Sequence, residues 1–137
     1  MDKFKANRRD IQIFSQKNGR LMLLHSEKDL RYSSRLEKDP LVVSYEPCVL
    51  LEEEGMARVN PLDIRSEYLD GSTMWESSFL VEYEGDTRVI YELIEDAAQL
   101  QKRAVVEKLE LSRRYWAGMG ITDWKVVVFG SAPQEVG

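Results

Sequence analysis

The hydrophobic period changes twice between residues 78 and 129, and this change constrains the fold more than any other feature of the sequence. Residues 78–83 and 88–94 have the alternation of strands, and Glu84-Gly85-Asp86 between them predicts a hairpin turn with antiparallel pairing. Residues 98–116 then follow a helical period, and residues 124–129 are apolar enough for a buried strand. Together these segments predict an α/β fold in which a mixed sheet is flanked by helices.

The helix over residues 98–116 has an apolar stripe and a basic remainder. One face of the 3.6-residue period carries Ala98, Val105, Leu109 and Trp116. Gly118 or Gly120 suits the left-handed cap that would end the helix. The cations off the stripe are Lys102, Arg103, Lys108, Arg113 and Arg114.

The first half of the chain predicts a hairpin, a helix and further strands. Asn18-Gly19 is a turn signal between the apolar runs 11–14 and 21–24. Ser26 with Asp29 resembles a capping box and opens a helix over residues 27–37. After it we expect a strand over 41–51, a turn at 52–55, a weaker strand over 56–64 and a turn at 70–72.

Length and composition predict one folded domain, since the chain has 137 residues of which 43% are hydrophobic. Residues 1–10 are expected to be a flexible arm and residues 130–137 a tail. No apolar run approaches the roughly 18 to 20 residues of a membrane span, and the first ten residues are too polar for a signal peptide. We therefore expect no membrane contact and a cytoplasmic location.

Cys48 and His25 are the only cysteine and the only histidine, which excludes a disulfide and argues against a Cys/His metal-ligand set. The sequence thus predicts no structural zinc, no metal site and no cofactor. Cys48 is interpreted as a small buried strand residue and His25 as a structural histidine. The net charge of -5 argues against general electrostatic binding of nucleic acid, so any DNA contact would be local.

Acidic residues on the opening helix and on the predicted hairpin give the outline of a metal-dependent nuclease. Such enzymes hold Mg²⁺ with two or three carboxylates and place a lysine two residues after the strand acid. Asp29 and Glu92 are the acids in this outline. Residues i and i+2 of a strand share a face, so residue 94 has the position of the lysine, but it is isoleucine.

Three stretches resemble the TnsA-type transposon-end endonucleases, which have the PD-(D/E)xK fold. They are residues 13–26, the segment Lys38-Asp39-Pro40-Leu41-Val42-Val43-Ser44-Tyr45-Glu46-Pro47, and the segment from Val106 to Trp116 with Gly120-Ile121 after it. Their order and separations agree with the family. The resemblance implies a restriction-endonuclease-like core over the single domain 1–137, without the C-terminal winged-helix-like domain that many members add.

The resemblance also implies a degenerate active site. The first metal-binding acid of the family falls on Asp29, its central aspartate on Ser78, and its (E/Q)-x-K element on Glu92-Leu93-Ile94. A serine lacks the negative charge that a hard divalent cation favours, and an isoleucine cannot stabilise developing charge. We therefore expect no catalytic residues and a protein that is not an enzyme.

Three functions are compatible with these observations. The leading hypothesis is an inactive nuclease-fold subunit that binds DNA or a partner, such as a transposase, in a nucleoprotein machine of a mobile element or phage. The second is an active Mg²⁺-dependent endonuclease with a rearranged site, for which nearby acids such as Glu76 are candidates. The third is a structural or inhibitory protein-binding module without DNA contact. The predicted DNA-binding residues are Lys102, Arg103, Arg113 and Arg114.

Overall fold

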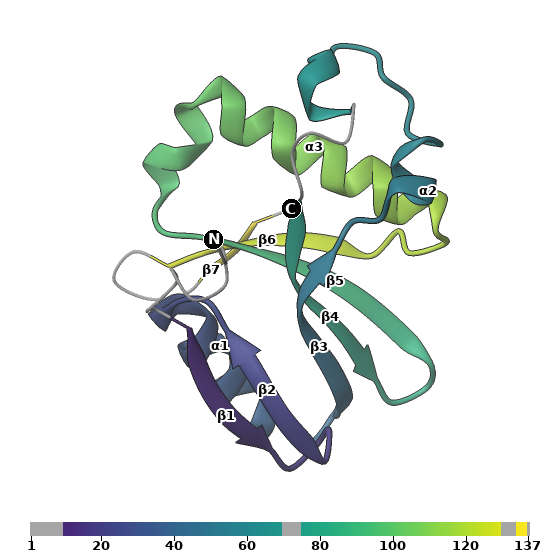
Figure 1. The fold of residues 1–137 in the computed structure, drawn as a ribbon. Helices are drawn as coiled ribbons and strands as arrows, with labels where there is room; N and C mark the ends of the chain where they lie inside the picture. Colours follow the sequence, from purple (N-terminus) through teal and green to yellow (C-terminus); the bar gives the residue numbers. More distant parts are fainter. Residues whose placement is uncertain (1–9, 70–74, 130–133, 137) are drawn as a thin grey trace, which may run out of the picture.

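A computed structural model describes residues 10–69, 75–129 and 134–136 (Figure 1). Most of the predicted arm and the predicted turn at 70–72 lie outside the described residues. In the part of the chain that is described, no helix has both the length and the apolar character to cross a membrane.

The predicted N-terminal hairpin and helix are confirmed. Strands β1 (Ile11–Ser15) and β2 (Arg20–Leu24) pair antiparallel, and Gly19 takes the positive φ of 68° that the turn requires. Helix α1 (Glu27–Lys38) begins at Ser26, whose hydroxyl accepts a hydrogen bond from the backbone N–H of Asp29.

The hairpin is held to α1 and to the sheet by a polar network around Glu37. Its carboxylate accepts hydrogen bonds from the hydroxyls of Ser15 and Tyr45, and the Tyr45 hydroxyl also bonds Ser33 at 2.8 Å. The backbone N–H of Tyr45 donates to Asn18 Oδ1 at 2.9 Å. These contacts tie the turn of the hairpin to the sheet.

The main sheet is mixed, as the sequence predicts. Its strands follow the order β3 (Val42–Leu50), β4 (Glu76–Tyr83), β5 (Thr87–Ile94), β6 (Trp124–Val128) and β7 (Gln134–Val136). Neighbouring strands are antiparallel except β5 and β6, which are parallel and joined through helix α3 (Arg103–Gly118). The element order around the sheet is therefore helix, three antiparallel strands, helix, parallel strand.

Each face of the sheet has its own core. On one face, α1 and the β1–β2 hairpin cover a cluster that includes Tyr32, Leu36, Phe79 and Tyr91. On the other face, α3 covers a cluster that includes Ile90, Leu111, Tyr115 and Trp116. Alternate residues of β5 enter opposite cores, as its two-residue period predicts.

The predicted weaker strand over residues 56–64 is wrong. This segment follows a short helix, α2 (Glu53–Met56), and leads to a 3₁₀ turn, η1 (Ser66–Tyr68). Met56, Val59 and Ile64 are buried in the α3-side cluster. Their side chains pack against residues of α3, and a few closely spaced apolar residues do not distinguish such packing from a strand.

The helix over 98–116 and the C-terminal tail also need correction. A 3₁₀ segment, η2 (Ala97–Gln101), is capped by Asp96, and α3 begins only after the extended Lys102. The break separates Ala98 from the rest of the predicted stripe. Of the other stripe residues only Trp116 is buried, while Val105 and Leu109 are partly exposed. The buried residues of α3 are Glu107, Leu111, Ser112, Tyr115 and Trp116. Within the predicted tail, residues 134–136 form β7.

Candidate functional site

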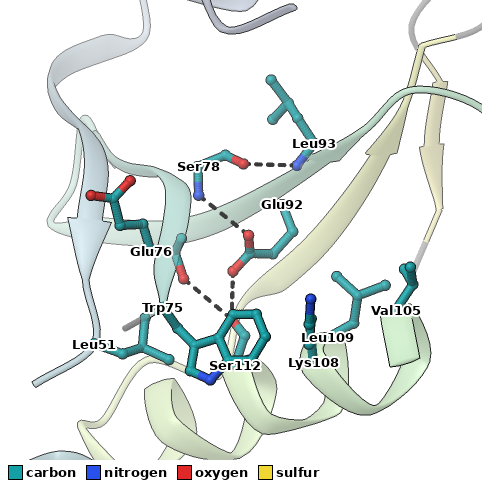
Figure 2. A pocket seen from close by; sticks show the side chains of 11 residues that line it. Leu51, Trp75, Glu76, Ser78, Glu92, Leu93, Val105, Lys108, Leu109 and Ser112 are labelled. Carbon is teal, nitrogen blue, oxygen red and sulfur yellow. Dashed lines mark hydrogen bonds between the residues drawn. The ribbon is translucent and has the colours of Figure 1, made fainter. Parts of the chain in front are cut away.

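Glu92 lies at the centre of the arrangement that the resemblance singles out (Figure 2). It belongs to β5, faces α3 and is 7% exposed. Its Oε1 accepts a hydrogen bond from the backbone N–H of Ser78 at 3.2 Å, and its Oε2 accepts one from the Ser112 hydroxyl at 2.5 Å. The carboxyl group is therefore bound to two elements, β4 and α3.

A set of hydroxyl and indole groups extends this network. Ser112 Oγ lies 3.2 Å from Ser77 Oγ and accepts a hydrogen bond from Trp124 Nε1 at 3.0 Å. Ser77 Oγ accepts one from Trp116 Nε1 at 2.8 Å. All of these partners are neutral. Sequence reasoning missed Ser77 and Ser112 because serines carry no pattern that predicts such a contact.

The neutral surroundings set the protonation state of Glu92. Burial raises the pKa of its carboxyl group, although the hydrogen bonds from Ser112, Ser77 and Ser78 oppose the shift. No cation of the described residues forms an ion pair with this carboxyl group. The net shift favours the uncharged form of Glu92 over a wider pH range than in an exposed glutamate, and this form is a poor ligand for a hard divalent cation.

The two other sheet positions of the family motif have structural contacts. The Ser78 hydroxyl accepts a hydrogen bond from the backbone N–H of Leu93 at 3.0 Å, in place of a backbone carbonyl. Ile94 is buried with Val126 and Val128 in a third apolar cluster. Position 94 thus contributes packing where the family implies a charged lysine.

Asp29, the fourth position, interacts with a different group of residues. Its carboxylate accepts a weak hydrogen bond from the backbone N–H of His25 at 3.4 Å, and it is 7% exposed. Among the described residues, no hydrogen bond joins Asp29 to Glu92. The structure therefore does not link these two acids through a direct contact.

A cavity of about 200 Å³ lies beside Glu92 and contains a lysine that sequence reasoning overlooked. Lys108 comes from α3, and its Nζ lies 4.4 Å from the centre of the Trp75 ring in a cation–π contact. Glu76 and Ser78 also line this cavity. The position of Lys108 beside this cavity could be predicted from the sequence only by knowing which face of α3 is buried.

Three of the four predicted DNA-binding cations are bound to the protein's own groups. Arg103 pairs with Glu107 at 2.9 Å. Arg113 and Arg114 both pair with Glu110, and the hydrogen bond from Arg113 is the main cause that lowers the pKa of Glu110 to about 2. Lys102, exposed directly before α3, forms no ion pair with another described residue. DNA binding by these residues remains a prediction.

Arg114 and Tyr115 connect α3 to the segment that follows β3. The Arg114 guanidinium donates to the backbone carbonyls of Asn60 and Leu62, each at 2.7 Å. The Tyr115 hydroxyl accepts a hydrogen bond from the backbone N–H of Glu52 at 3.0 Å. These contacts, with that of Trp116, account structurally for the motif Arg113-Arg114-Tyr115-Trp116.

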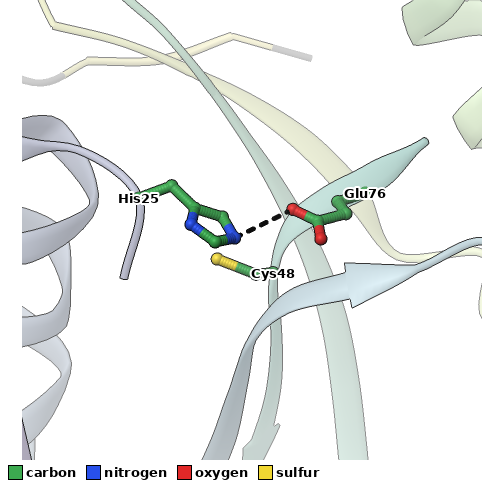
Figure 3. Close-up of side chains that lie close together, drawn as sticks. All are labelled: His25, Cys48 and Glu76. Carbon is green, nitrogen blue, oxygen red and sulfur yellow. Dashed lines mark ion pairs between the residues drawn. The ribbon is translucent and has the colours of Figure 1, made fainter. Parts of the chain in front are cut away.

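A second cluster of chemically active groups lies on the α1 side of the β3–β4 edge (Figure 3). The nitrogen, sulfur and oxygen ligand atoms of His25, Cys48 and Glu76 all lie within 4.8 Å of one another. The Cys48 thiol and the Glu76 carboxylate are therefore near enough to His25 to bind a metal ion together with it. The three residues are far apart in the sequence, so no spacing pattern could have revealed the cluster.

The cluster lies in acidic surroundings. His25 Nδ1 is 2.9 Å from Asp10 Oδ1, and its Nε2 is 3.4 Å from Glu76 Oε1. Burial lowers the pKa of His25, but Asp10 and Glu76 outweigh it and the net shift is upward. Burial, with the charges of Asp29 and Glu76, raises the pKa of the Cys48 thiol to about 12. Cys48 is only partly buried and has a φ of 52°, so it is not the ordinary buried strand residue that was expected.

The outer face of the β1–β2 hairpin is apolar and exposed. Phe14 and Leu21 are directly opposite in the register, and Leu23 lies on the same face. Their exposed fractions are 61%, 59% and 49%. We refer to these three residues as the hairpin face.

A scan against models of known protein families and a search of curated proteins each found no match to this chain.

Proposed function

We propose that this chain is a TnsA-like nuclease-fold protein without nuclease activity, which serves as a partner-binding subunit in a nucleoprotein machine of a mobile element or phage. The mixed sheet flanked by helices is compatible with the nuclease fold that the sequence resemblance implies. Fold alone does not determine activity, so the functional part of the proposal depends on the site.

The state of Glu92 carries the proposal that the protein is inactive. A metal-dependent nuclease needs charged carboxylates at its metal and a cation near the reacting phosphate. Here the β5 acid is buried among serine and tryptophan groups, and the positions beside it are Ser78 and Ile94. The polar groups of the site are used to hold β4, β5 and α3 together.

A protein partner is favoured over DNA by two surface observations. Arg103, Arg113 and Arg114 are engaged by Glu107 and Glu110, which reduces the charge that α3 offers to phosphates. The hairpin face, in contrast, exposes adjacent large apolar side chains, a property typical of protein-interaction surfaces.

Incubation with supercoiled plasmid tests the inactivity directly. With Mg²⁺ or Mn²⁺ present, we expect no nicking by the wild-type protein beyond the level seen with Glu92→Ala. Nicking that Glu92→Ala abolishes would refute the proposal. A gel shift at low salt should show little DNA binding, and the effect of Lys102→Ala on any shift would measure the contribution of that lysine.

Co-expression with the products of adjacent genes tests the partner-binding role. We expect a complex that is lost in Leu21→Ser and retained in Leu62→Ser, because Leu62 is 65% exposed but lies outside the hairpin face. Equal retention of the partner by both variants would exclude the hairpin face as the binding surface.

An active endonuclease is the second candidate, and one observation favours it. Lys108, Glu76 and Glu92 line one cavity, so a cation from α3 could stand in for the lysine missing at position 94. In this case Mn²⁺-dependent nicking should be lost in Lys108→Met as well as in Glu92→Ala. Loss in only one of these variants would argue against a shared site.

A further inference from the structure

His25, Cys48 and Glu76 present three different donor atoms to one small volume (Figure 3). His25 precedes α1, Cys48 belongs to β3 and Glu76 opens β4, so the positions of the donors are fixed by separate elements. His25 Nε2 and Glu76 Oε1 are 3.4 Å apart. Bond lengths of about 2.0 to 2.3 Å put two tetrahedral zinc ligands about 3.3 to 3.8 Å apart, so this pair already has the spacing of two ligands on one ion.

The orientation of His25 suits metal binding. Asp10 Oδ1 lies 2.9 Å from Nδ1, and a carboxylate can only accept the hydrogen bond. The proton is therefore on Nδ1, and the other ring nitrogen faces Glu76. A carboxylate that orients a histidine in this way is the usual outer partner of a metal-binding imidazole.

The donor set selects the kind of metal. Imidazole, thiolate and carboxylate together suit zinc, whereas magnesium and calcium prefer oxygen ligands alone. A cavity of about 670 Å³ lined by all three residues offers access from solvent. Asp10 and Glu52 also line this cavity and favour a cation there, while Glu46 is paired with Arg20.

We propose that His25 Nε2, Cys48 Sγ and Glu76 bind one Zn²⁺ ion, with Asp10 as the outer carboxylate that orients His25. Three protein ligands leave the fourth tetrahedral position for water or for a ligand in the cavity. The site is independent of the proposed function, because it uses none of the residues of the Glu92 network.

The competing explanation is a simple ion pair between protonated His25 and Glu76, with no part for Cys48. Metal titration separates the two explanations. Calorimetry with Zn²⁺ on the purified, chelator-treated chain should show one site, and Co²⁺ should produce the absorption of a cobalt–thiolate bond. Cys48→Ser should remove that absorption, and His25→Ala should abolish binding of either metal.

Two variants control for folding. Glu76→Gln removes a half-exposed ligand, and Glu84→Gln removes an exposed acid of the β4–β5 turn that lies outside the cluster. We expect Glu76→Gln to weaken Zn²⁺ binding while its metal-free unfolding midpoint stays near that of wild type. Glu84→Gln should bind as wild type does. Asp10→Asn should weaken binding by about 10- to 100-fold.

Absence of the cobalt–thiolate band in the wild-type protein would overturn the proposal. Zinc binding that persists unchanged in both Cys48→Ser and His25→Ala would overturn it as well. Because these readouts need only the metal and the intact chain, they remain decisive whether or not the protein proves to be a nuclease.

Discussion

Replacing Glu92 by glutamine tests whether the carboxyl group at the centre of the site is neutral in the folded protein. Glutamine has the shape of a protonated glutamate. Its carbonyl oxygen can accept the Ser78 N–H, and its amide can donate to Ser112 Oγ, which lies 2.5 Å from the native carboxyl oxygen. The variant therefore keeps the packing and the hydrogen-bond partners of Glu92 but has no side-chain group at position 92 that can ionise.

The sign of the effect follows from the direction of the pKa shift. Burial raises the pKa of Glu92 above its ordinary value of 4.5, so the folded chain retains a proton that the unfolded chain releases. The stabilising contribution of this proton is complete below pH 4.5 and is lost as the pH rises through the folded-state pKa. Within that window the wild-type protein loses up to about 1.4 kcal/mol of stability per pH unit through this group.

Glu92→Gln should lack this loss. Its free energy of unfolding should be close to that of wild type at about pH 4.5 and should exceed it increasingly as the pH rises toward the folded-state pKa of Glu92. Urea denaturation followed by tryptophan fluorescence at several pH values measures the difference. Glu84→Gln, in an exposed turn, is the control and should follow wild type throughout.

Two results would refute the reasoning. A difference between Glu92→Gln and wild type that stays constant with pH would mean that Glu92 has the same protonation state in folded and unfolded chains. A variant that becomes less stable than wild type as the pH rises would mean that the serine network stabilises the charged carboxylate. In either case the argument for a neutral, inactive site would fail.

Two further substitutions test the packing that positions the site. Gly55→Ala should cost about 1–3 kcal/mol of stability, because the added Cβ would lie within 2.9 Å of the Tyr115 ring carbon Cζ. Gly118→Ala is the control, since its added Cβ has open space, and it should be neutral or slightly stabilising. A smaller loss of stability in Gly55→Ala than in Gly118→Ala, measured by urea denaturation, would contradict this. Tyr45→Phe should cost about 1–3 kcal/mol, because it removes a donor to Glu37 from a largely buried network; an unchanged urea midpoint would show that the network contributes nothing to docking the hairpin.

Local patterns were sufficient to predict most elements. The turn at Asn18-Gly19, the cap at Ser26 and the hairpin turn at residues 84–86 each depend on a few neighbouring residues, and all three are confirmed. The hydrophobic pattern failed where side chains are buried by packing against another element and not by forming a strand or a regular helix of their own. Residues 56–64 contain apolar residues that pack against α3 without forming a strand, and the extended Lys102 separates Ala98 from the helix that follows.

The sequence by itself determined which chemical groups are present at the positions that the resemblance singles out. Ser78 and Ile94 cannot supply a charge in any fold, and no structure was needed to see this. It also determined most of the strands and the two long helices, because hydrophobic period and turn residues are local properties.

Only the tertiary structure decided the protonation equilibrium of Glu92 and which side chains lie next to the other charged and metal-binding groups. Burial raised the pKa of Glu92, ion pairs with Glu110 occupied two arginines of α3, and the packing of the sheet brought His25 and Cys48 next to each other. These outcomes depend on distances between residues remote in the chain and on exclusion of water. Neither quantity is encoded in the spacing of residues along the sequence.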